Sequence, residues 1–222
     1  MSEVRVLIHA YPKRMWYVEG FLVPELQRQG ADSIEIWNDA EGLGNLRACM
    51  ASFASRQGDG GTWHIQDDVL LCRDFVERCR QHNEGVVYGF CCEQFLDDPQ
   101  QVGRLSVEDA WHSFQCVRIP DAYARDCAAW LDGAGRGHSF YPLWIRSGKM
   151  DDSVWREYLL TEHPRETVEN LRPCLVEHVD HIIGGSALHP WRGYWARAHW
   201  WDDEDLVREL QEAVRGKVQY VN

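Results

Sequence analysis

The most specific structural signal in this chain is the segment Gly61-Thr-Trp-His-Ile-Gln-Asp-Asp-Val-Leu-Leu-Cys-Arg-Asp-Phe75. Its apolar first part ends in two adjacent carboxylates, Asp67 and Asp68, and a second apolar run follows them. This pattern predicts a buried strand with acidic side chains at its end. Because Mg²⁺ and Mn²⁺ prefer oxygen ligands, the pair is a candidate site for a metal that holds a nucleotide diphosphate. An Asp-rich turn between two strands is the alternative interpretation.

The residues before this segment alternate between strand and helix patterns. Strands are expected at residues 4–9 and 33–37, and helices at 15–29 and 45–56. This order, with short loops, is typical of a parallel sheet with crossover helices. Ligands of such sheets bind beyond the C-terminal ends of the strands. The side chains expected there belong to residues 11–14, to Asp39 and to the acid pair.

Length and composition favour one soluble domain. The chain has 222 residues, of which 45% are hydrophobic, and we expect one domain over 1–222 with halves at about 1–110 and 111–222. It has no apolar run of about 18 residues and no signal-peptide layout at its start, which predicts a cytoplasmic protein without a membrane span. Its eight cysteines contain no Cys-x-x-Cys pair, so buried thiols in a reducing compartment are expected.

Charge and aromatic content bear on partners. The net charge is −12 and the 23 basic residues are scattered, which disfavours non-specific nucleic-acid binding, although a local basic groove stays open. Six of the 11 tryptophans lie between Trp144 and Trp201. They either fill the core or form an aromatic surface that stacks on sugars and bases.

The second half of the chain offers further candidates. Strands are expected at 85–90 and 113–120 and helices at 121–131 and 150–160, with Asp151 or Asp152 as the N-cap of the last helix. The run from Arg172 to Ser186 holds His178 and His181. A zinc site is disfavoured, because no third ligand stands at a suitable spacing.

As a set, these features of the first 75 residues resemble the nucleotide-sugar-binding half of GT-A-type glycosyltransferases. In that family, a loop after the first strand cups the nucleoside and the second strand ends in an acidic residue. A Gly-rich turn then leads into a helix that carries an Arg, and a later strand ends in the acidic metal motif. The matching positions here are Tyr11-Pro-Lys-Arg14, Asp39, Gly42-Leu-Gly-Asn-Leu-Arg47 and Gln66-Asp-Asp68. The resemblance implies a GT-A-like α/β fold, a mixed and mainly parallel sheet flanked by helices, with a Trp-rich C-terminal extension.

The acidic segment is most similar to the Glu-Asp-Asp-Val motif of lipopolysaccharide-type and phage-encoded glycosyltransferases, with Gln66 in place of the usual acid. The resemblance implies that Asp68 binds Mn²⁺ or Mg²⁺ directly and that Asp67 contacts the ribose or a metal-bound water. Arg47 would face the nucleotide or its phosphates, and a solvated helix residue is the alternative. Tyr11 and Arg14 would belong to the nucleoside loop.

The segment Pro173-Cys-Leu-Val-Glu-His178 is similar to a Pro-x-Leu-Val-x-His segment near the end of many glycosyltransferases of this fold. It implies that His178 completes the metal site or contacts the diphosphate, and His181 is the other candidate. An acid at the start of the late helix, Asp151 or Asp152, would act as catalytic base or bind the acceptor, whereas a helix cap would explain it without catalysis.

The expected activity is metal-dependent transfer of a sugar from a nucleotide diphosphate sugar, with a UDP-sugar as first expectation, to an acceptor hydroxyl. A glycan or a hydroxymethylated DNA base are the acceptors considered, the latter for a phage-type enzyme in the host cytoplasm. Two alternatives use the same residues. One is a nucleotidyltransferase on a similar sheet, and the other is a non-catalytic nucleotide-sugar-binding protein.

Overall fold

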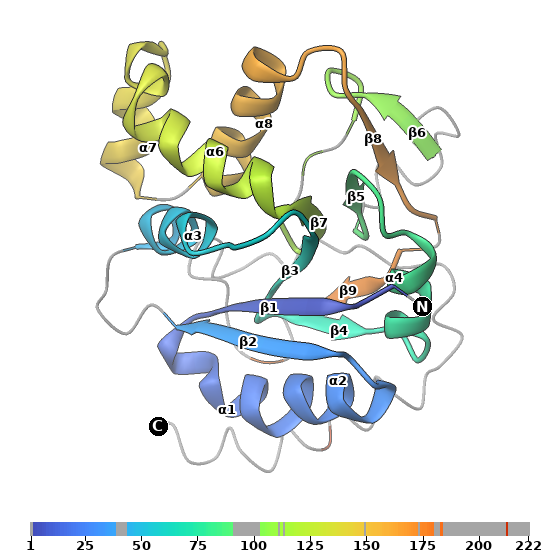
Figure 1. Ribbon diagram of the computed structural model, residues 1–222. Coiled ribbons are helices and arrows are strands. Elements are labelled where there is room, and N and C mark those ends of the chain that lie inside the picture. Colours follow the sequence, from blue (N-terminus) through green and yellow to red (C-terminus); the bar gives the residue numbers. More distant parts are fainter. Residues whose placement is uncertain are drawn as a thin grey trace.

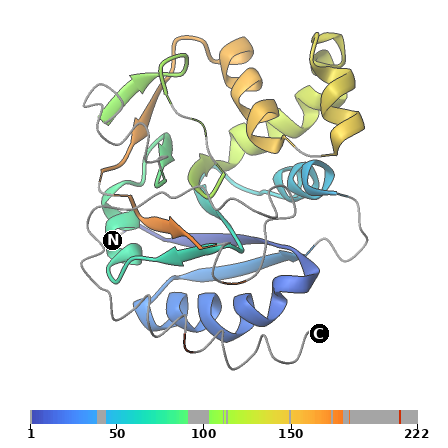
Figure 2. The same ribbon diagram turned by 180° about the vertical axis from the view of Figure 1, so that it is seen from behind.

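The computed structural model describes residues 2–38, 44–90, 103–110, 112, 114–148, 150–172, 174–179, 183 and 212 (Figure 1). A mixed seven-stranded sheet forms the centre of this α/β structure, in the order β2-β1-β3-β7-β5-β8-β6. Helices cover both faces of the sheet (Figures 1 and 2). The expected extension around Trp191 and Trp201 lies outside the described residues.

The first three strands pair as the sequence predicts. β1 runs parallel to both β2 and β3, whereas β7 is antiparallel to β3 on one side and to β5 on the other. A separate antiparallel pair, β4 with β9, follows the acidic turn. The strands are β1 (Arg5–Ala10), β2 (Ser33–Asn38), β3 (Gly61–Gln66), β4 (Val69–Leu71), β5 (Val86–Tyr88), β6 (Gly103–Ser106), β7 (Cys116–Pro120), β8 (Thr167–Asn170) and β9 (Val176–His178).

The predicted helices are present, with two differences. The helix expected at 15–29 contains a π-helical turn, Val18–Leu22, and ends at Gly30, whose φ of 79° suits glycine. The predicted N-cap of the late helix is wrong, because Met150 is the cap and Asp151 is already helical. The helices are α1 (Met15–Tyr17), α2 (Val23–Gln29), α3 (Asn45–Ala54), α4 (Phe75–Gln81), α6 (Asp121–Asp132), α7 (Tyr141–Ser147) and α8 (Asp151–Glu162), with short 3₁₀ turns at Pro12–Arg14 and Ala134–Gly137.

Alternating side chains of the sheet build two cores. Trp63 and Ile65 of β3 join the core that also takes buried side chains from α1, α2 and α4. The opposite core gathers α3, α6 and α8. Trp144 and Trp155 are fully buried there, so these two tryptophans fill the core rather than an aromatic surface. Each large buried apolar side chain contributes about 1.5–3 kcal/mol.

The described cysteines agree with the sequence prediction. All six are buried thiols that form no disulfide, and burial raises the pKa of the Cys72 thiol to about 12. Cys91 and Cys92 lie outside the described residues. Within the described part of the chain, no helix is long and apolar enough to cross a bilayer.

Candidate functional site

The acid pair and the first loop meet because β1 and β3 are parallel neighbours. His9 of β1 lies in register with Gln66 of β3, so the turn after β1 and the turn after β3 leave the same edge of the sheet. The first turn carries Tyr11 and Arg14. This edge, at the C-terminal ends of the strands, is where parallel sheets bind ligands.

Arg14 bridges the two carboxylates. Its Nη1 atom lies 2.8 Å from Oδ1 of Asp67 and 2.7 Å from Oδ2 of Asp68. The backbone N–H of Tyr11 donates to Oδ2 of Asp67 at 2.5 Å. Arg14 and both aspartates are buried. Both oxygens of Asp67 therefore have partners within the protein.

His178 reaches the same acids from the far end of the chain. Pairing of β9 with β4 sets His178 opposite Val69, directly after the acidic turn. Its Nε2 lies 3.3 Å from Oδ2 of Asp68, and the N–H of Val179 donates to the Asp68 carbonyl at 2.8 Å. The structure thus brings together five predicted site residues, Tyr11, Arg14, Asp67, Asp68 and His178.

The two carboxylates differ in acidity. Burial raises the pKa of Asp67 to about 6, the charge of Asp68 adds to this effect, and Arg14 opposes it. Burial also disfavours the charged form of Asp68, but hydrogen bonds and charge from His178 and Arg14 outweigh it and lower its pKa. Asp68 is therefore the more acidic member of the pair.

One oxygen of Asp68 is left over. Its Oδ1 is buried and has no hydrogen-bond partner, a state that typically costs about 1–3 kcal/mol unless a ligand satisfies the atom. Oδ2 of the same group stands 3.3 Å from His178 Nε2, close to the roughly 3 Å expected between adjacent ligands about 2.1 Å from one octahedral metal. The same 3.3 Å separation is that of an ion pair between the two side chains, and carboxylate oxygen and imidazole nitrogen are also donor types that bind divalent cations.

Protein groups alone do not complete such a centre. Among the residues that the structure describes, no three His, Cys, Asp or Glu side chains are grouped to hold a metal. Mg²⁺ and Mn²⁺ sites commonly take only one or two carboxylates and fill the remaining positions with water and substrate phosphates. An incomplete protein shell is thus the form expected where the metal arrives with a diphosphate.

Asp151 lies at a second position on this edge. As the crossover helix after β2, α3 begins at the C-terminal edge of the sheet, and Asn45 in its first turn donates from Nδ2 to Oδ1 of Asp151 at 2.9 Å. Asp151 is buried, and burial together with the charge of Asp152 raises its pKa to about 7. Asp152 itself is exposed, and its Oδ1 accepts the N–H of Ser153 at 2.7 Å. Of the two predicted acids, Asp151 has the environment of a base that works near neutral pH.

Three predicted site residues remain, namely Asp39, Arg47 and His181. Asp39 and His181 lie outside the described residues. Arg47 is exposed on α3 and has no hydrogen bond or ion pair to a described residue, which fits the solvated alternative. Asn45 is a site residue that the sequence did not predict. The only local signal for Asn45 is its place directly after Gly44 at the start of a helix.

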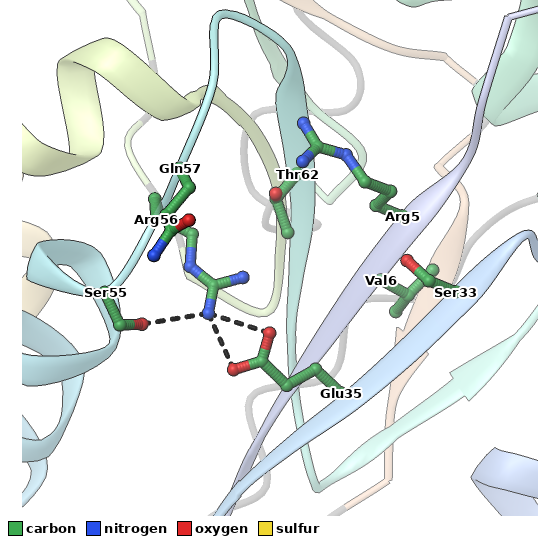
Figure 3. A pocket seen from close by; sticks show the side chains of 8 residues that line it. All are labelled: Arg5, Val6, Ser33, Glu35, Ser55, Arg56, Gln57 and Thr62. Carbon is green, nitrogen blue, oxygen red and sulfur yellow. Dashed lines mark hydrogen bonds and ion pairs between the residues drawn. The ribbon is translucent and has the colours of Figure 1, made fainter.

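A pocket lies at the other edge of the sheet (Figure 3). It measures about 260 Å³ and includes the N-terminal ends of β1 and β3, the edge opposite the acid pair. Its guanidinium groups are engaged, because Arg56 pairs with Glu35 at 2.7 Å and Arg5 with Asp121 at 2.5 Å. The buried carboxylate oxygen without a partner lies at the acid pair, away from this pocket. The pocket is lined by Arg5, Val6, Ser33, Glu35, Ser55, Arg56, Gln57 and Thr62.

In comparisons with known proteins, no protein-family model and no curated protein matched this chain.

Proposed function

We propose that this chain is a metal-dependent glycosyltransferase with a GT-A-like fold. It would move a sugar from a nucleotide diphosphate sugar, with a UDP-sugar as the first donor to test, to an acceptor hydroxyl. One observation carries the proposal. Asp68, at the C-terminal end of a parallel strand, has one buried oxygen without a partner and the other 3.3 Å from His178. The strand-end position and these two donors support a metal-bound diphosphate.

The residues around Asp68 have separable roles in this proposal. Asp68 and His178 would hold Mn²⁺ or Mg²⁺, which when bound neutralises charge that develops on the leaving diphosphate. Tyr11 is a 44% exposed aromatic residue whose backbone N–H binds Asp67, and its ring would stack on a base. Asp67 fixes this loop by accepting from Tyr11 and Arg14.

Asp151 would take the proton of the acceptor hydroxyl. With a pKa of about 7, part of the carboxyl population is ionised at neutral pH, and that carboxylate is basic enough to accept a proton. Asn45 holds the carboxyl through Oδ1, so Oδ2 is the atom we assign to proton transfer. Asp152 is exposed beside it and would contact the acceptor.

Release of free nucleotide tests the proposal. The protein is incubated with UDP-, GDP- and TDP-sugars and Mn²⁺, with and without a glycan or hydroxymethylated DNA as acceptor. We expect one donor to give nucleoside diphosphate, with loss of the signal in EDTA and in Asp68→Ala. Arg28→Met is the matched control, because Arg28 forms an exposed pair with Glu25 on α2.

Each alternative gives a different result. A nucleotidyltransferase, when given a nucleoside triphosphate and a sugar phosphate, would join the two and release pyrophosphate from the triphosphate. A binding protein without catalysis would bind the donor and release nothing. Either outcome would replace the proposed activity.

A further inference from the structure

We propose that Arg14 is a resident counter-cation of the acid pair, which a divalent cation displaces from Asp68 when the nucleotide diphosphate enters. This inference rests on the proposed function and deepens it. Arg14 would pair with the two carboxylates before the nucleotide binds and with the diphosphate afterwards.

The geometry places Arg14 where it opposes a metal. A single nitrogen, Nη1, lies 2.8 Å from Asp67 Oδ1 and 2.7 Å from Asp68 Oδ2. It therefore stands between the two carboxylates, and it shares Oδ2 of Asp68 with His178. A cation that binds this oxygen meets the guanidinium at contact distance.

Charge makes the two cations compete. The two carboxylates and Arg14 together carry one negative charge, and removal of the guanidinium would leave two. The three groups are buried, so water screens them weakly and a divalent ion beside Arg14 is strongly repelled. The protein should therefore bind the metal weakly until Arg14 has another anion to pair with.

The diphosphate supplies that anion. Guanidinium groups pair with phosphate oxygens through two parallel hydrogen bonds. Arg14 ends the short turn Pro12–Arg14, and this turn follows Tyr11, whose side chain faces solvent. A nucleotide that stacks on Tyr11 would bring its diphosphate close to this turn. Transfer of Arg14 to the phosphates would free Asp68 for the metal, which couples metal binding to nucleotide binding.

Mn²⁺ affinity without nucleotide tests the exchange. We expect Arg14→Met to bind Mn²⁺ at least about tenfold more tightly than the parent, measured by titration calorimetry or by the electron paramagnetic resonance of free Mn²⁺. With UDP present, both proteins should gain Mn²⁺ affinity because the diphosphate supplies ligands, and the variant should gain less than the parent. Arg28→Met should match the parent in both titrations. Circular dichroism checks that each variant is folded.

Equal or weaker Mn²⁺ binding by Arg14→Met would overturn the exchange. If that variant does not fold, Arg14→Gln keeps a donor for Asp67 without the charge and takes its place, with the same expected gain. Failure of the proposed function shows up separately, as absence of nucleotide release from every nucleotide sugar. Tighter Mn²⁺ binding by the variant in that case would still support the exchange.

Discussion

The two ends of β1 and β3 each hold a buried aspartate paired with an arginine, yet the two clusters differ in completeness. At the N-terminal end, Asp121 accepts from Thr62 through Oδ1 at 2.8 Å and from Arg5 through Oδ2 at 2.5 Å. At the C-terminal end, Asp68 shares Oδ2 between Arg14 and His178 and leaves Oδ1 without a partner.

The Asp121 cluster stabilises the fold, whereas the Asp68 cluster is the one for which we propose a ligand. Both oxygens of Asp121 are satisfied, and its neighbour Gly60 gives Arg5 the room that a Cβ would fill, so this cluster joins α6 to the sheet. Asp68 keeps an unsatisfied oxygen, which destabilises the fold unless a ligand binds. Asp151 lies between these cases, because the one side chain hydrogen-bonded to it in the described structure, Asn45, is neutral.

The largest effect is expected at Asp68. Asp68→Ala should lower metal-dependent activity by at least about 1,000-fold, roughly 4 kcal/mol, because a metal ligand is lost. The unfolding free energy should change little, because Arg14 keeps its pair with Asp67. Steady-state turnover and urea unfolding measure the two quantities. Activity within about threefold of the parent would show that Asp68 is not a ligand.

Asp151 should make the unfolding free energy depend on pH. Its pKa rises from 3.8 to about 7 on folding, so the folded state disfavours the ionised form and stability is lost as pH increases from about 4 to 7. Relative to Asp151→Asn, which cannot ionise, the parent should lose about 3 kcal/mol of unfolding free energy across this window. Urea unfolding at several pH values gives the difference, and parallel curves for the two proteins would contradict the raised pKa.

Asp121 should behave in the opposite way to Asp68. Asp121→Ala should cost about 2–3 kcal/mol of unfolding free energy, because Arg5 and Thr62 lose a buried partner. The Arg5 side chain is 26% exposed, so water relieves part of this cost. Turnover per folded molecule should match the parent. Loss of activity without loss of stability would mean that this end of the sheet also takes part in the chemistry.

His178 should give the smallest effect of the set. His178→Ala should weaken Mn²⁺ binding in the presence of UDP by about tenfold, since one of two protein donors is lost. His181→Ala is the comparison variant and should bind as the parent does. Calorimetry on both proteins decides between them, and the reverse result would assign the role to His181.

The sequence predicts the parts of the fold that local patterns encode. Apolar runs with intervening helices predict β1, β2 and β3 as parallel neighbours, and the position of Asp67 and Asp68 after such a run places them at the ligand-binding edge. Strand order is not a local property. The antiparallel insertion of β7 between β3 and β5 follows from long-range pairing that periodicity does not specify.

The site residues, too, are predictable from the sequence only where a local pattern marks them. Tyr11, Arg14 and the acid pair are recognisable as strand-end residues, but the bridge from Arg14 to both acids depends on two turns that meet only in the folded sheet. The contact of Asn45 with Asp151 joins the starts of two helices and has no sequence signal beyond Gly44. The predicted cap at Asp151 was wrong because Met150, with a φ of 72°, takes that position.

Ligand-dependent melting distinguishes a metal-bound diphosphate at Asp68 from other modes of nucleotide binding. A ligand that binds only the native state raises the melting temperature by mass action, and the account requires the diphosphate and the metal to bind together at Asp68. UDP with Mn²⁺ should therefore raise the melting temperature of the parent by several degrees, and UDP with EDTA should not. The shift should disappear in Asp68→Ala and persist in Asp121→Ala. Equal shifts with Mn²⁺ and with EDTA would contradict a metal bridge at the end of β3.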